Sequence, residues 1–259
     1  MSFVRFDVRD KVGVVVFNNP GKRNALSRPL LEELVLAFAA LREKKVPVVV
    51  LRAEDGAKTW SAGADLAEIH ADRHDPLGYN SPLERVFHAV ENYPGPVIAM
   101  VRGGAWGGAC DLALTCDIAV GDPSASFAIT PVKVGIPYNA SGILHFINRL
   151  GLSRAKEMFF TAEPVDAERA LAFGLLNHLV AAEKLEAFTL ELAHTIASHS
   201  PLSIAVIKEQ FRILSGAHPI SPDSFERIEE LRREVFESHD FAEGVAAFLE
   251  KRKPAFRGE

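Results

Sequence analysis

The sequence predicts an α/β fold that ends in a helical region. Apolar runs of strand length alternate with stretches of helical periodicity through most of the chain, and residues 185 to 251 show helical patterns only. Strand-and-helix units followed by a run of helices are typical of an α/β core with a separate helical part. We therefore expect an α/β core over residues 1–184 and a C-terminal helical region over residues 185–259.

The N-terminal part begins with a strand pattern. Val4–Val8 and Val12–Phe17 alternate or run apolar, which predicts two strands in a hairpin that turns at Arg9–Lys11. A helix is expected over Pro29–Leu41, because Ser27 can cap it and its apolar residues recur at helical spacing. The next expected elements are a strand at Val46–Arg52, a loop at Ala53–Trp60, a short helix at Ala64–Ala71, a helix at Leu83–Asn92, a strand at Pro96–Arg102 and a helix over Gly107–Thr115.

The second half of the chain continues the alternation. Strands are expected at Asp117–Gly121, Ser126–Ile129 and Asn177–Val180, and helices at Ser141–Leu150, Ser153–Thr161 and Asp166–Phe173. Glycine, proline and polar residues predict a mobile loop at His70–Pro82. His70 and His74 have the i, i+4 spacing of zinc ligands, but the following Asp75-Pro76 ends any helix there, so we expect no metal site.

Composition excludes several classes of protein. The chain is 48% hydrophobic and 24% charged, which is ordinary for a globular protein. No apolar run has the ~18 residues that a membrane span needs, and the N-terminus lacks the pattern of a secretory signal. A net charge of -5 without an extended basic block gives no support for nucleic-acid binding. Cys110 and Cys116 are the only cysteines, so a disulfide framework is excluded and a cytoplasmic protein is expected.

Two clusters of tiny residues stand where a strand is expected to lead into a helix. They are Trp60–Leu66 (WSAGADL) and Ala105–Leu112 (AWGGACDL). Small side chains at such positions let a substrate oxygen approach backbone N–H groups closely. If both clusters converge on one oxygen, they form an oxyanion hole for an enolate or a tetrahedral intermediate. Alternatively, the small residues only allow close packing between a helix and a sheet.

Several motifs together resemble the enoyl-CoA hydratase/isomerase (crotonase) superfamily. They are Asn24-Ala25-Leu26, Ser61–Leu66, Gly107–Asp111 with Cys116-Asp117, and Ala170–Gly174 with Leu175, and they extend over nearly the whole chain. The resemblance implies a core built as a spiral of ββα turns, a helical C-terminal region, and assembly as a homotrimer or a homohexamer of two trimers. It also implies that the backbone N–H groups of Ala64 and Gly108 form the oxyanion hole.

Further motifs resemble the decarboxylases of this superfamily, which act on methylmalonyl-CoA and related malonyl-CoA thioesters. They are Asp75-Pro76-Leu77 with Tyr79, Trp106–Ala109, Thr130-Pro131-Val132, Gly135–Asn139 and Phe248–Pro254. The resemblance implies that Tyr138 holds a substrate carboxylate and that Thr130 lies beside the acyl group. This chain departs from that pattern at Ala64, which replaces a histidine, and at Asp111, which replaces a glutamate.

The residues at the two acid positions argue against hydration. By resemblance, hydratases need one carboxylate at position 111 and a second at position 132, because water must be oriented and a proton must reach carbon. Here the first is Asp111, but the second is Val132, which cannot move a proton. Decarboxylation does not need that second acid, and an apolar surround of Val132 and Ile136 suits it. Asp111 then either orients Tyr138 or a water, or only complements the positive end of its helix.

Coenzyme A combines anionic phosphates with an apolar arm. Lys22 and Arg23 are basic residues that can approach the phosphates, and Lys251 resembles a family residue that reaches the ligand. By the same resemblance, the thioester channel is lined by Ala25, Ala64, Asp65, Leu66, Ala67, Glu68, Gly108, Thr130 and Val132.

We therefore expect an enzyme that converts methylmalonyl-CoA, or a related malonyl-CoA thioester, to propionyl-CoA and CO2. No cofactor beyond the coenzyme A of the substrate is expected, because the thioester itself accepts the electrons. Two alternatives remain open at this point. One is an acyl-CoA hydrolase or an enzyme of the enoyl-CoA hydratase/isomerase type, in which Asp111 activates water. The other is a non-catalytic protein that binds acyl-CoA.

Overall fold

A computed structural model of the chain describes residues 2–68, 78, 81–216 and 221–258. Its strands form a six-stranded sheet of order β1-β2-β3-β5-β7-β10 and a four-stranded sheet of order β4-β6-β8-β9. The strands are β1 (Val4–Arg9), β2 (Val12–Phe17), β3 (Val48–Ala53), β4 (Thr59–Ser61), β5 (Val97–Val101), β6 (Gly104–Trp106), β7 (Ile118–Gly121), β8 (Ser126–Ala128), β9 (Val165–Asp166) and β10 (His178–Leu179). The expected N-terminal hairpin is confirmed, since β1 and β2 pair antiparallel.

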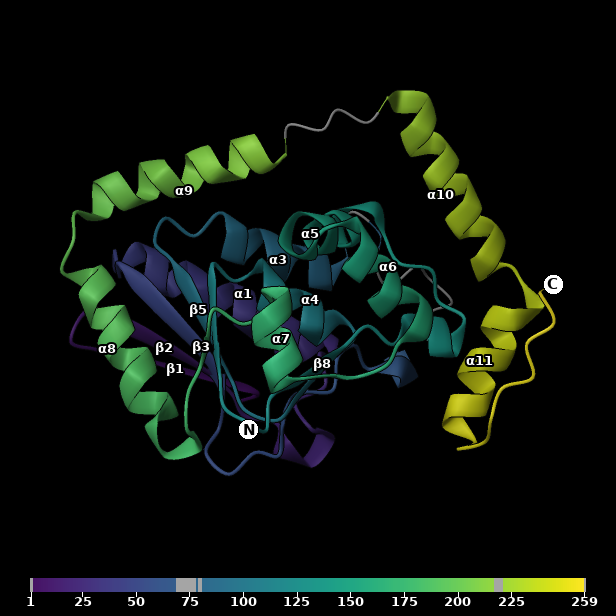
Figure 1. Ribbon diagram of the computed structural model, residues 1–259, viewed down its shortest axis with the longest axis horizontal. Coiled ribbons are helices and arrows are strands. Elements are labelled where there is room, and N and C mark those ends of the chain that lie inside the picture. The colour runs from purple at the N-terminus through teal and green to yellow at the C-terminus, as the bar shows by residue number, and fades with distance from the viewer. Residues whose placement is uncertain (1, 69–77, 79–80, 217–220, 259) are drawn as a thin grey trace.

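Helices surround the two sheets (Figure 1). They are α1 (Arg28–Glu43), α3 (Pro82–Glu91), α4 (Gly108–Thr115), α5 (Ala140–Leu150), α6 (Leu152–Thr161), α7 (Ala167–Phe173), α8 (Leu185–Ala197), α9 (Pro201–Ser215), α10 (Pro222–Phe236) and α11 (His239–Leu249), with short 3-10 helices η1 (Pro20–Lys22), η2 (Pro131–Val134) and η3 (Ala182–Lys184). The sequence predicted α1 and α3 to α7 individually and expected helices without separate bounds after residue 184, whereas the 3-10 helices were not predicted. The segments expected at His70–Pro82 and at the end of Ala64–Ala71 lie largely outside the described residues.

The large sheet is covered on both faces. On one face its side chains join the main core, which includes Phe17 and Leu51 together with Leu34 of α1 and Phe87 of α3. On the other face α8 packs its Leu185 and Ala193 against valines of β2 and β3. We expected residues 185–259 to form a region separate from the core. These residues are helical where described, but α8 packs against the large sheet as a layer of the core. The helices outside the core begin with α9 (Figure 1).

The second sheet was mostly missed by the sequence patterns. Only β8 was expected, whereas the segment of β4 was assigned to a loop and β6 and β9 were not recognised. These strands have three, three and two residues. Such strands are too short to show the alternation by which longer strands are recognised. They matter for function because their ends carry the residues of the site.

Parallel pairing brings three distant segments to one edge of the second sheet. In β4 and β6, Thr59 lies opposite Gly104 and Ser61 lies opposite Ala105. β6 then pairs parallel with β8, where Trp106 lies opposite Ala128. Since parallel strands end at the same edge, the residues after β4, β6 and β8 are neighbours. The strand pairs β3/β4, β5/β6 and β7/β8 each add one strand to the large sheet and one to the second sheet before the chain turns helical, as expected for a ββα spiral.

Helix α11 packs closely on η2. A Cβ atom on Gly244 of α11 would lie 2.5 Å from the carbonyl carbon and oxygen of Val134. Phe241 and Val245 of α11 also form a small buried cluster with Val134 and Ile136. Only glycine at position 244 lets the helix approach this closely, so α11 stays against the segment that follows β8. None of the described helices is long and apolar enough to cross a membrane.

We predict that Gly244→Ala destabilises the fold. The added methyl group overlaps the backbone of η2, and such overpacking typically costs about 1–3 kcal/mol. Urea unfolding measures the effect. The matched control is Gly21→Ala, where nothing lies within 4 Å of the added methyl group, so its unfolding midpoint stays at the wild-type value. Equal midpoints for the two variants would contradict the close approach of α11.

Candidate active site

A cavity of about 510 Å³ opens where the second sheet meets α11. Its walls come from segments far apart in the sequence: the loop before α1, both small-residue clusters, the start of α3, the segment after β8, and the C-terminal helix. They are Ala25, Ala62, Gly63, Ala64, Asp65, Leu66, Ala67, Leu83, Gly107, Gly108, Thr130, Pro131, Lys133, Val134, Ile136, Tyr138, Gly244, Phe248, Leu249, Arg252 and Pro254. The wall is mainly small and apolar.

The two small-residue clusters meet inside this cavity. A Cβ atom on Gly63 would lie 3.4 Å from the nitrogen of Gly108 and 2.3 Å from the carbonyl oxygen of Trp106. Gly63 also has a φ of 79°, in the left-handed region. Both facts require glycine there. The clusters therefore pack closely and also bring backbone to the cavity wall. The two interpretations of these clusters are compatible with each other.

Two backbone N–H groups remain available at this meeting point. Gly108 is the first residue of α4, where an N–H group has no acceptor within its helix. Within the described part of the chain, neither the Gly108 nitrogen nor the Ala64 nitrogen donates a hydrogen bond outside regular structure. An anion here also gains from the positive end of the helix. Both residues line the cavity.

Asn24 holds the first cluster in place. Its side chain is fully buried, donates to the carbonyl oxygen of Trp60 at 3.1 Å and accepts from the Asn19 nitrogen at 2.9 Å. The backbone carbonyl oxygen of Asn24 accepts from the Ser61 hydroxyl at 2.6 Å. The next residue, Ala25, therefore comes to the cavity wall, and the loop before α1 becomes part of the site.

Tyr138 is part of the cavity wall, and its hydroxyl points to the buried Asp111. Its side chain lines the cavity, is 7% exposed, and donates to Asp111 Oδ2 at 2.8 Å. A Cβ atom on Gly142 would lie 2.2 Å from Tyr138 Cε1, so glycine makes room for the ring. Burial and the adjacent Asp111 raise the pKa of Tyr138 well above its usual range. The hydrogen bond from Tyr138 to Asp111 fits the expectation that Asp111 orients Tyr138.

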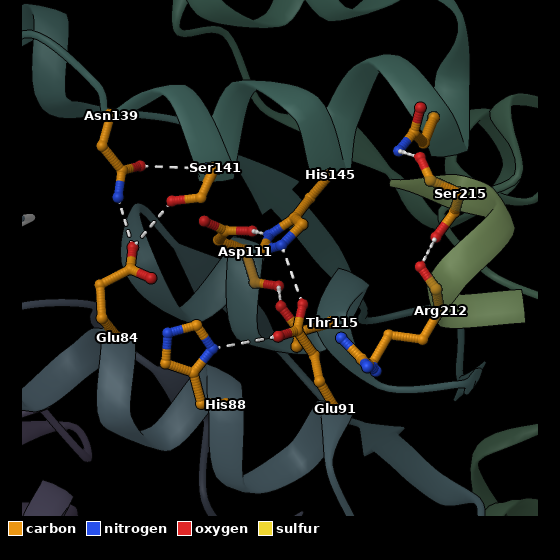
Figure 2. A network of polar contacts seen from close by, with 12 residues as sticks. Glu84, His88, Glu91, Asp111, Thr115, Asn139, Ser141, His145, Arg212 and Ser215 are labelled. Atoms are coloured by element: carbon orange, nitrogen blue, oxygen red, sulfur yellow. Dashed lines mark hydrogen bonds and ion pairs between the residues drawn. The ribbon is translucent and has the colours of Figure 1, made fainter. Parts of the chain in front are cut away.

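Asp111 is also joined to a histidine that the sequence patterns did not single out (Figure 2). Asp111 Oδ1 lies 2.8 Å from His145 Nδ1, and His145 Nε2 lies 3.2 Å from Glu91 Oε1. Burial acts to lower the pKa of His145, but hydrogen bonds and charge from Asp111 and Glu91 outweigh it and raise that pKa to about 10. His145 is therefore a cation at neutral pH.

A second buried acid lies beside this network. Glu84 of α3 is 2% exposed, accepts from the Asn139 side chain, and accepts from the Ser141 hydroxyl at 3.1 Å. Burial raises the pKa of Glu84, while the two hydrogen bonds act in the opposite direction. Figure 2 shows Glu84 beside Asp111. The hydrogen bonds to Glu84 come from Asn139 and Ser141, at the start of α5, and not from His145.

The sequence matches the profile of the enoyl-CoA hydratase/isomerase family over residues 7–259. The chain belongs to this family. It is 44% identical over 257 residues to methylmalonyl-CoA decarboxylase of Escherichia coli (strain K12), covering 99% of this chain and 98% of that relative.

Two solved structures are also similar to this chain. One is a methylmalonyl-CoA decarboxylase complexed with 2S-carboxypropyl-CoA, at a TM-score of 0.97 and 43% identity, covering 100% of this chain and 99% of that chain. The other is a methylmalonyl-CoA decarboxylase in complex with 2-nitronate-propionyl-CoA, at a TM-score of 0.96 and 43% identity, covering 99% of both chains. The resemblance noted in the sequence is thereby confirmed, and so is the fold.

The structure brings most of the predicted site residues of this family member together. The predicted residues that line the cavity are Ala25, Ala64, Asp65, Leu66, Ala67, Gly108, Thr130 and Tyr138. Asp111 lies behind Tyr138 with no exposed surface. Ile136, expected as part of an apolar surround, also lines the cavity. Their roles in binding and catalysis stay predictions.

Val132 and Lys251 are placed differently from the expectation. The side chain of Val132 is 48% exposed and is not part of the cavity wall, whereas Pro131 and Val134 are. A 3-10 helix has about three residues per turn, so η2 turns these two residues to one side and Val132 to another. In the C-terminal segment, Arg252 lines the cavity in place of Lys251, which is exposed.

Three more predicted residues lie at the edge of the site. Lys22 is ion-paired with Asp65 at 3.1 Å, and its side chain is largely exposed. Arg23 is exposed and contacts the site only through its carbonyl oxygen, which accepts from the Ala62 nitrogen. Glu68 accepts from the Arg28 nitrogen at the start of α1, so it ties the first cluster to that helix.

Sequence reasoning missed Lys133, Arg252 and His145. Lys133 directly follows Thr130-Pro131-Val132 and Arg252 lies within Phe248–Pro254, so both are basic residues in or beside motifs that the sequence offered. His145 is 34 positions from Asp111, and nothing in the spacing signals the pair. His70 and His74 lie outside the described residues. Among the residues that are described, no three or more His, Cys, Asp or Glu side chains are arranged to hold a metal ion.

We predict that His145 makes stability depend on pH. Its pKa rises from about 6.5 in the unfolded chain to about 10 in the folded protein, so its contribution is fully present below pH 6.5. That contribution falls as the pH rises toward 10, by at most about 1.4 kcal/mol per pH unit. Urea unfolding of the wild type and His145→Gln from pH 6.5 to 10 should show the two stabilities converging. A difference that is constant with pH would contradict a charged His145.

Proposed function

We propose that this protein decarboxylates methylmalonyl-CoA, or a related malonyl-CoA thioester, to propionyl-CoA and CO2. The observation that carries the proposal is that Ala64, Gly108 and Tyr138 line one cavity, with the Tyr138 hydroxyl bound to Asp111 at its wall. The backbone N–H groups of Ala64 and Gly108 suit a thioester oxygen, and the hydroxyl suits a carboxylate. The high identity to a relative named methylmalonyl-CoA decarboxylase supports the same reaction.

The reaction proceeds through a thioester enolate. The bond between the α-carbon and the carboxylate carbon breaks, CO2 leaves, and the electron pair moves onto the thioester oxygen. Two preorganised N–H donors stabilise that negative charge, and loss of one such donor typically costs ~3 kcal/mol. A proton then adds to the α-carbon and gives propionyl-CoA. We propose that no metal or organic cofactor takes part, because the thioester carbonyl accepts the electrons.

The breaking bond must stand out of the plane of the thioester carbonyl, so that it overlaps the π system. We propose that a hydrogen bond from Tyr138 to the substrate carboxylate sets this angle. Apolar side chains surround the position, with Leu83, Val134 and Ile136 on the cavity wall. Such an environment favours a spread enolate charge over a localised carboxylate charge.

The described part of the cavity wall does not present the pair of carboxylates that hydration needs. Asp65 is the one carboxylate among the described cavity-lining residues, and it is held by Lys22 and by the Ala67 nitrogen. Asp111 is covered by Tyr138. A water molecule would thus have no pair of carboxylates to orient it. This supports decarboxylation over the hydratase reaction.

We propose that coenzyme A enters along the C-terminal helix. Lys133 and Arg252 supply positive charge at the cavity for its phosphates, and Leu66, Phe248 and Leu249 supply apolar surface for its arm. Arg252 is already fixed by Glu243, with contacts of 2.6 and 2.8 Å. Its Nε also donates to Glu250 at 2.6 Å, so the guanidinium is held in one orientation at the cavity wall.

We also propose that the protein forms a homotrimer or a homohexamer, and that it is cytoplasmic. Helix α9 exposes large apolar side chains, including Leu202 at 76% and Phe211 and Leu214 at 70% each, which favours burial against another copy. The two buried cysteines are free thiols, which fits a reducing compartment. Sedimentation analysis tests the assembly.

The purified protein should release CO2 from methylmalonyl-CoA. Tyr138→Phe should lower kcat about 10- to 100-fold, because a hydrogen bond to a charged group contributes about 1.5–3 kcal/mol. The matched control is Tyr93→Phe. It removes another buried hydroxyl, bound to the Val46 carbonyl oxygen, and should leave kcat unchanged.

The substrate panel includes malonyl-CoA, ethylmalonyl-CoA, crotonyl-CoA and saturated acyl-CoA thioesters. No CO2 from any of the three malonyl-type thioesters would overturn the proposed reaction. Turnover of crotonyl-CoA or of saturated thioesters in its place would identify hydratase or hydrolase activity. Tight binding without any turnover would identify a protein that only binds acyl-CoA.

A further inference from the structure

His145 contacts the catalytic network without lining the cavity. We propose that His145 is a positioning residue that makes the cavity selective for thioesters carrying a carboxylate. Its imidazolium neutralises Asp111, so that the Tyr138 hydroxyl can turn from Asp111 to the carboxylate of the substrate. This inference rests on the proposed function, because it concerns the same tyrosine and the same substrate carboxylate.

The geometry at both ring nitrogens assigns the charged form. Nδ1 lies 2.8 Å from Asp111 Oδ1, and Nε2 lies 3.2 Å from Glu91 Oε1. An ionised carboxylate only accepts hydrogen bonds, so each nitrogen must donate, and only the imidazolium has two N–H groups. The ring is held laterally by Phe87, whose edge meets it at 84° with the centroids 6.0 Å apart. His145 therefore has little freedom to leave the pair of acids.

Other charged groups surround this pair from several elements. Helix α3 presents Glu84, His88 and Glu91, α4 presents Asp111 and the thiol of Cys110, and Arg212 of α9 acts on Glu91 from the far side. Figure 2 shows His88 reaching toward Glu91 and His145 standing between Glu91 and Asp111. Glu91 is stabilised as an anion by both histidines. His145 is the cation in hydrogen-bond contact with the buried Asp111.

Tyr138 has one proton to donate, and two acceptors compete for it. Without substrate the hydroxyl donates to Asp111 Oδ2 at 2.8 Å. A substrate carboxylate needs the same proton. If Asp111 were an uncompensated anion, it would keep the proton and would also repel the second carboxylate at short range in a buried site. Contact with the imidazolium weakens Asp111 as an acceptor and offsets that repulsion.

This arrangement separates ligands by charge. A thioester that carries a carboxylate requires the Tyr138 hydroxyl to be released from Asp111. A thioester without a carboxylate makes no demand on the hydroxyl. Loss of the His145 charge should therefore weaken binding of the first kind and leave the second kind unchanged. A role limited to holding the fold would affect both kinds alike.

The test compares two ligands by calorimetry, 2S-carboxypropyl-CoA, which has a carboxylate, and propionyl-CoA, which has none. For His145→Gln we expect affinity for the first to fall about tenfold or more, and affinity for the second to stay within about twofold of the wild-type value. The matched control is His194→Gln, an exposed histidine on α8, which should behave as the wild type. Equal losses for both ligands, or no loss for either, would overturn the proposal.

A second test measures how the preference for the carboxylate ligand depends on pH. In the wild type, the preference for the carboxylate ligand should decline as the pH approaches 10, where His145 loses its proton. Glu91→Gln removes one of the two acids that raise this pKa, so the decline should move to lower pH. His145→Gln should show no decline over this range. An unchanged pH profile in Glu91→Gln would contradict the role of His145.

Failure of the two proposals can be told apart. A wild-type protein that releases no CO2 from any malonyl-type thioester overturns the proposed reaction, whatever the variants do. A wild-type protein that releases CO2, together with a His145→Gln variant that binds both ligands normally, overturns only the role of His145.

Discussion

Parallel pairing of β4 with β6 is the constraint on which the site depends. It sets Ser61 opposite Ala105, so the chain leaves both strands at one edge of the second sheet. The clusters that follow can then approach until Gly63 lies against the backbone of Trp106 and Gly108. Side chains larger than hydrogen at position 63 would force them apart. The sheet therefore sets the positions of the Ala64 and Gly108 backbones, and the proposed oxyanion hole requires such fixed positions.

The polar side of the site follows from the cost of burying charge. Asp111 has no exposed surface, and a lone buried carboxylate would be strongly destabilising. Tyr138 and His145 together satisfy it, one with a hydroxyl and one with a cation. The same partners that stabilise the buried acid also decide where the tyrosine proton points. Stability and chemistry thus share one set of contacts, which connects the cavity to α3 through Glu91.

The sequence predicted the fold to a large extent because long elements have clear periodicity. The helices α1 and α3 to α7 and the strands β1 to β3 were recognisable in this way. The strands β4 and β6 were not, because three residues carry no measurable alternation. Ala64, Gly108 and Tyr138 were found by resemblance to a family. Val132 was misplaced because the turn of η2 is not visible in the sequence, and His145 meets Asp111 only after α4 and α5 have packed.

A crystal structure of the protein with a nitronate analogue of propionyl-CoA would test the oxyanion hole most directly. The nitronate resembles a carboxylate or an enolate, while the thioester carbonyl remains intact. We expect the thioester oxygen about 2.7–3.1 Å from the nitrogens of both Ala64 and Gly108. We also expect the nitronate to contact the Tyr138 hydroxyl. A thioester oxygen that contacts neither nitrogen, or a nitronate that lies away from Tyr138, would contradict the enolate mechanism.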